Sequence, residues 1–137
     1  MNAHLDFSDS EFEKQFRDGK LDPSLFNHEA HVRLAWIHIN TYGIEAACDT
    51  VSNQILSYVS QLGATDKFNK TLTIAAIKIV HHFVQKSKSH TFKDFIREFP
   101  RLKSNFKELL DSHYGFDIFN SKKAKTEYLE PDLLPFS

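Results

Sequence analysis

The chain has 137 residues, of which 41% are hydrophobic, with only four Gly and four Pro. This length suits a single domain, residues 1–137, with one core, and the low Gly and Pro content disfavours a fold of many strands and turns. With 17 basic and 18 acidic residues the formal net charge is −1. Such a balance indicates neither a nucleic-acid partner nor an anionic membrane surface.

Other features of composition predict a soluble cytoplasmic protein. The single cysteine, Cys48, excludes an intramolecular disulfide and suits a reducing compartment. The first residues contain neither a basic region nor an apolar run, so no signal peptide is expected. No stretch approaches the ~18 consecutive apolar residues of a membrane span.

The first two helices have clear start signals. Ser8 and Glu11 form a capping box ahead of a helix that carries Phe12 and Phe16 on one face. Asn27 is expected to cap a second helix that runs to about residue 42. That helix is apolar around most of its circumference, which predicts a central element surrounded by partners.

The remaining elements follow from helical spacing and stop signals. Further helices are expected at about residues 44–62, 66–86, 91–99 and 102–113. A short helical turn after residue 116 leads to an arm with Pro131 and Pro135, expected to pack onto the body. The prediction is an all-α fold: a single compact bundle of about five to six helices with an extended C-terminal arm.

Histidines recur along the second helix. His28, His31 and His38 lie within ~80° of one another on the helical wheel, near the middle of the apolar arc. All three are therefore expected to point inward. Glu29 and Arg33, with Asn40, make up the one narrow polar strip of this helix.

Three uses of such imidazoles stay open: metal ligand, acid–base group, or hydrogen-bonded core residue. In the first hypothesis His28 and His31, one turn apart, bind a divalent first-row ion (Zn, Fe, Ni or Mn), with His113 or His82 as a further ligand. The pocket of such a metalloprotein or small metalloenzyme would be formed by Trp36, His38, Tyr42, Asn69 and Tyr114.

The second hypothesis is a metal-free helical module. Its histidines satisfy core hydrogen bonds, while the C-terminal arm binds a small ligand or a partner protein. A homo-oligomer is compatible with either hypothesis. His4 and His90 are expected to be terminal and loop residues without a role, and Cys48 to be core rather than nucleophile.

The segment from Phe26 to Trp36 resembles the F-x-H-x-x-H-x-R-x-A-W signature of a family of small, functionally uncharacterised bacterial proteins. The resemblance continues in K-T-x-T at 70–73, H-Y at 113–114 and E-P-D-L-x-P at 130–135. It implies an all-helical protein of the bacterial cytoplasm and no particular activity. In many members of the family a histidine precedes K-T-x-T, whereas Asn69 stands there in this chain. If that histidine is a third metal ligand in the family, this chain has lost it or replaced it with a weak amide oxygen.

Overall fold

The computed structural model describes residues 3–136. Within this range the regular structure consists of eight α-helices and three 3-10 helices, without a strand, which confirms the all-α prediction. The chain forms two compact units that divide between Phe68 and Asn69. Organisation as a single domain stays a prediction.

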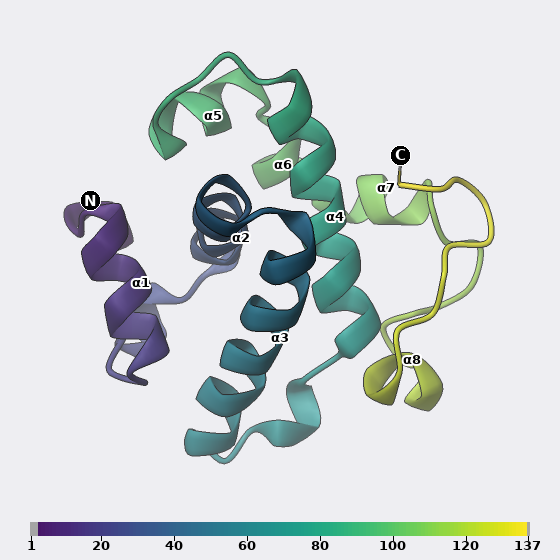
Figure 1. Cartoon of the computed structure of the whole chain (residues 1–137). Coiled ribbons are helices and arrows are strands. Elements are labelled where there is room, and N and C mark those ends of the chain that lie inside the picture. Colours follow the sequence, from purple (N-terminus) through teal and green to yellow (C-terminus); the bar gives the residue numbers. More distant parts are fainter. Residues whose placement is uncertain (1–2, 137) are drawn as a thin grey trace. The chain divides into compact units, whose positions relative to one another are not determined.

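The first unit contains three α-helices that pack on one another (Figure 1). Its elements are η1 (Ala3–Asp6), α1 (Asp9–Arg17), η2 (Pro23–Leu25), α2 (His28–Tyr42), α3 (Ile44–Gln61) and η3 (Thr65–Lys67). The predicted capping box at Ser8 and the predicted Asn27 cap are both present. Gly43 joins α2 to α3 with φ of 92°, a backbone conformation that glycine adopts without strain.

The core of this unit is built from rings and aliphatic side chains. Phe12 and Phe16 of α1 are fully buried, as are Leu34 of α2 and Val51 of α3. The ring of Phe16 lies 4.7 Å from that of Tyr58, whose hydroxyl donates to the Leu21 carbonyl. Aromatic side chains thus link the helices at the centre of the unit.

The burial of α2 differs from the prediction in two ways. Glu29 and Arg33 of the polar strip are buried, because the N-terminal segment covers them, whereas Asn40 is exposed. Of the three histidines only His38 points into the interior; His28 and His31 are exposed. A helical wheel gives the direction in which a side chain points, but not how much of the helix length is covered by other segments. His28 and His31 lie in the first turn of α2, where they are left exposed.

The second unit begins with the helix α4, which contacts α7 and α8 (Figure 1). Its helices are α4 (Lys70–Lys86), α5 (Phe92–Glu98), α6 (Arg101–Ser104), α7 (Phe106–Asp111) and α8 (Lys122–Thr126). The fourth predicted helix was placed too early, because Asn69 caps α4 and residues 65–67 form η3 instead. The sixth predicted helix is interrupted at Asn105, where φ is −130°.

The C-terminal arm, residues 127–136, packs onto the second unit as predicted. The Leu133 amide donates to the His113 carbonyl at 3.0 Å, and the Gly115 amide donates to Asp132 Oδ1 at 2.7 Å. Nearer α8, the buried Thr71 hydroxyl donates to the Glu127 carbonyl and accepts from the Leu129 amide. The arm is therefore held at several points along its length by hydrogen bonds of its backbone and of the Asp132 side chain.

Across residues 3–136, none of the helices combines the length and apolar character that crossing a membrane requires.

Candidate histidine pairs and a buried polar cluster

His31 has a fixed orientation in the first turn of α2. Its Nδ1 lies 3.0 Å from the Asn27 carbonyl oxygen, and its ring stacks on Phe26 with centroids 3.8 Å apart. A carbonyl can only accept, so Nδ1 carries the proton of this bond. In the neutral ring Nε2 then keeps its lone pair.

The surroundings of His31 favour the neutral ring. Loss of water around the imidazole lowers its pKa, although the residue as a whole is exposed. The Asn27 carbonyl opposes this shift, whereas neighbouring His28 adds to it. His28 and His31 thus lie close enough to influence each other and form the first histidine pair.

A second pair lies within the second unit. His113 places Nδ1 2.9 Å from the Leu134 carbonyl of the arm, and its ring centroid is 4.4 Å from that of Phe136. Burial lowers the pKa of His82, and repulsion from Lys86 and His113 adds to the shift. His82 and His113 are therefore electrostatic neighbours.

The predicted ligands consequently fall into two pairs, one in each unit. In the range 3–136 no group of three or more His, Cys, Asp or Glu side chains is placed to hold a metal ion. Each pair offers two imidazoles.

The predicted pocket residues of the first unit have separate surroundings. Trp36 and His38 are buried, at 7% and 1% exposure, whereas Tyr42 is 52% exposed. The Tyr42 hydroxyl donates to Glu13 Oε2 at 3.0 Å. Tyr42 therefore lies at the surface, and Cys48, expected in the core, is half-buried.

The two predicted pocket residues of the second unit have structural contacts. Asn69 accepts from the Leu72 amide as the cap of α4, and its Nδ2 donates to the Ile118 carbonyl at 2.7 Å. The buried Tyr114 hydroxyl donates to the Leu129 carbonyl at 2.8 Å, and burial raises the pKa of Tyr114. Tyr114 also lines a hollow of about 440 Å³, together with Phe116 and Phe119, whereas Asn69 does not.

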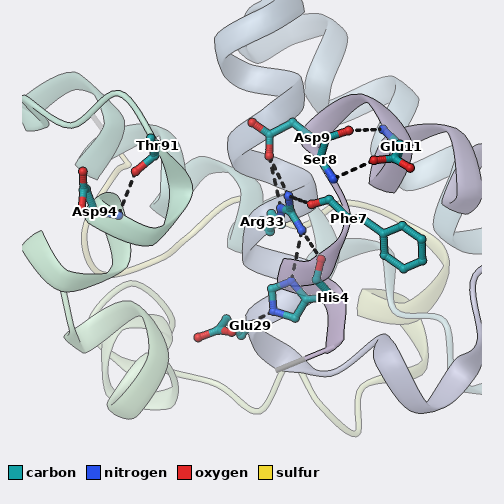
Figure 2. Close-up of polar contacts among 9 residues, drawn as sticks. All are labelled: His4, Phe7, Ser8, Asp9, Glu11, Glu29, Arg33, Thr91 and Asp94. Atoms are coloured by element: carbon teal, nitrogen blue, oxygen red, sulfur yellow. Dashed lines mark hydrogen bonds and ion pairs between the residues drawn. The ribbon is translucent and has the colours of Figure 1, made fainter. Parts of the chain in front are cut away.

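A buried polar cluster at the N-terminus was missed by sequence reasoning (Figure 2). His4, expected to be a terminal residue without a role, is 1% exposed, and its Nε2 lies 2.7 Å from Glu29 Oε1. Arg33 donates to the carbonyls of His4 and Phe7 and to Asp9 Oδ1, the last at 2.9 Å.

Arg33 has several partners in this cluster at once. The Arg33 guanidinium also lies 4.8 Å from the centroid of the Phe12 ring, a cation–π contact. Glu29 and Arg33 are four residues apart on α2, which was the only sequence signal, and nothing in the sequence identifies His4 as their partner. A buried arginine that is hydrogen-bonded in this way attaches the N-terminal segment to α2.

No protein-family model, curated protein or solved structure matches this chain. The resemblance to a bacterial protein family therefore stays a prediction.

Proposed function

We propose that this protein binds a divalent first-row metal ion through its paired histidines, His28 with His31 and His82 with His113. One observation carries the proposal. In both pairs, one ring holds Nδ1 against a backbone carbonyl: His31 against Asn27 at 3.0 Å and His113 against the arm at 2.9 Å.

This arrangement matches the chemistry of histidine ligands. A ligating imidazole binds through one nitrogen and usually donates its other N–H to a carbonyl or carboxylate, which fixes the ring and increases its basicity. The ring must also be neutral to bind. The lowered pKa values of His31 and His82 favour that form.

The small number of ligands bears on the type of site. An ion held by two imidazoles keeps several positions for water or another molecule, and open positions distinguish catalytic from structural zinc sites. A small metalloenzyme, whose ion activates water or polarises a substrate, is the extension of this proposal.

Elemental analysis of protein purified without a histidine tag tests the proposal. The wild type is compared with His28→Ala/His31→Ala and His82→Ala/His113→Ala, and the exposed His90 supplies a control, His90→Ala. We expect near-stoichiometric metal in the wild type and control, and a loss in at least one double variant. The proposal fails if the wild type stays metal-free after soaking with Zn, Fe, Ni and Mn, or if both double variants keep its metal content.

A second candidate function is binding of a partner protein by the C-terminal arm. Leu133 and Leu134 are 57% and 54% exposed, although the backbone beside them is bonded to the unit. Truncation after Leu129 is then expected to weaken association, in analytical ultracentrifugation or pull-down, more than any histidine substitution. A chain that is monomeric at every concentration and captures no partner would contradict this candidate.

A further inference from the structure

His38 is a buried histidine whose ring nitrogens, Nδ1 and Nε2, are not hydrogen-bonded to any of the described residues, 3–136. It lies on α2 with 1% of its surface exposed. Burying an unmatched polar group is unfavourable. A simple core position would be filled better by leucine or methionine, so the imidazole calls for another explanation.

The nearest charged group belongs to α1. Glu13 Oε2 lies 3.5 Å from His38 Nε2, slightly too far for a good hydrogen bond. The same oxygen accepts from the hydroxyl of Tyr42, which is half-exposed and whose ring centroid is 5.3 Å from that of His38. Glu13 therefore lies between the buried imidazole and a group that reaches solvent.

Among residues 3–136, the charge that acts on His38 is that of Glu13. Lys14 follows Glu13 on α1, and Arg17, one turn further along, acts on Tyr42. The buried residues of α3 are uncharged: Ala47, Val51, Ser52, Ile55 and Tyr58.

We propose that His38 and Glu13 form an acid-responsive contact between α1 and α2, in which a proton that reaches His38 from solvent past Tyr42 and Glu13 loosens α1. At neutral pH the uncharged ring packs as a core side chain. The imidazolium needs water or a closer carboxylate, and either requires α1 to shift. The device is independent of metal binding, since His38 belongs to neither histidine pair.

The direction of the effect follows from proton linkage. Burial lowers the pKa of His38, and attraction to Glu13 only partly opposes this. The folded chain then binds fewer protons than the unfolded chain, whose histidines titrate near 6.5. The contact is at full strength above that pH and weakens as the pH falls below it.

Amide hydrogen exchange of the full chain between pH 7.5 and 5.0, with titration of the His38 ring by NMR, tests the proposal. We expect the protection factors of α1 to fall by up to about 30-fold at pH 5, the limit for one suppressed protonation from 6.5. In His38→Leu the fall should disappear, whereas Glu13→Gln should steepen it because the imidazolium loses its partner. His90→Gln should match the wild type.

A second substitution keeps the test possible if the leucine variant does not fold. If His38→Leu does not fold, His38→Gln, which cannot titrate, replaces it with the same expected loss of pH dependence. An equal fall of α1 protection in wild type and in the non-titrating variant would overturn the proposal. So would a His38 ring that titrates at 6.5 or above.

Discussion

The two terminal segments are anchored by different chemistry. The N-terminal strap, residues 4–9, is bound by the buried Arg33, a charged group that reaches two carbonyls and the Asp9 carboxylate. The C-terminal arm is bound by uncharged groups of the second unit: the Thr71 hydroxyl bonds the arm's backbone, and the backbone amides of the arm and of Gly115 bond the His113 carbonyl and the Asp132 carboxylate.

Because of this difference, substitutions in the two anchors should lower the stability of the protein by different amounts. A buried charge is tolerated only while its partners are present, because removal of one partner leaves the others without compensation. A neutral hydrogen bond contributes about 1 kcal/mol. We therefore expect one substitution, at Arg33, to release the strap, whereas each single substitution among the contacts of the arm should lower the free energy of unfolding only slightly.

Arg33→Met gives the largest expected effect. The substitution leaves the His4 and Phe7 carbonyls without their charged donor and Asp9 without its cation, so we expect the free energy of unfolding to fall by about 3–5 kcal/mol. Chemical denaturation measures it. Arg17→Met is the control, since Arg17 is exposed in a surface pair with Asp18 and should matter by less than about 1 kcal/mol. Equal effects of the two substitutions would refute a charged anchor.

Acidification should give the second largest loss of stability, after Arg33→Met. Burial lowers the pKa values of four histidines, so the folded chain resists protonation: His31, His38, His81 and His82. The free energy of unfolding should decline below pH 6.5, by up to about 2 kcal/mol at pH 5 from the buried His38 and by less from each of the three more exposed rings. Thermal denaturation from pH 8 to pH 5 measures it, and a constant midpoint would indicate solvated rings.

Thr71→Val tests the neutral anchor of the arm. The change keeps the side-chain shape but removes the hydroxyl that bonds both Glu127 and Leu129, so we expect a loss of about 1–2 kcal/mol. Thr73→Val, two residues later in α4, is the matched control and should cost clearly less. Comparable losses would show that the hydroxyl of Thr71 does not hold the arm.

Asp132→Ala gives the smallest expected effect. Its carboxylate accepts from the Gly115 amide at 2.7 Å, but the residue is exposed and water can replace it. We expect a loss below about 1 kcal/mol, with faster amide exchange at residue 115. Asp132→Asn keeps an acceptor oxygen and should restore protection; failure to do so would indicate that the charge matters more than the bond.

Local chemistry made much of the fold predictable. Ser8, Asn27 and Thr91 accept backbone amides as helix caps, a role that depends on the few residues beside them. The all-α class followed in the same way from periodicity and from stop signals such as Gly43. The arm was predictable as well, because its two prolines cannot continue a helix.

Parts of the candidate sites were not predictable from local sequence. The spacing placed His28 and His31 together, but not at the surface, since exposure depends on which segments reach the first turn of α2. The backbone carbonyl that fixes His113 comes from Leu134, twenty-one residues later. No periodicity describes a contact over that separation.

The sequence by itself determined where helices begin and end, and which residues share a helix face, because those properties depend on neighbours within one or two turns. Only the tertiary structure decided which faces are buried, since that depends on segments far away in the chain. It made His4 the partner of Glu29 and buried Arg33 as an anchor for the N-terminal strap. It also placed His38 in the core without a hydrogen bond to any residue in the range 3–136. Burial and pairing of charges are properties of the packed chain, which explains why helices were easier to predict than sites.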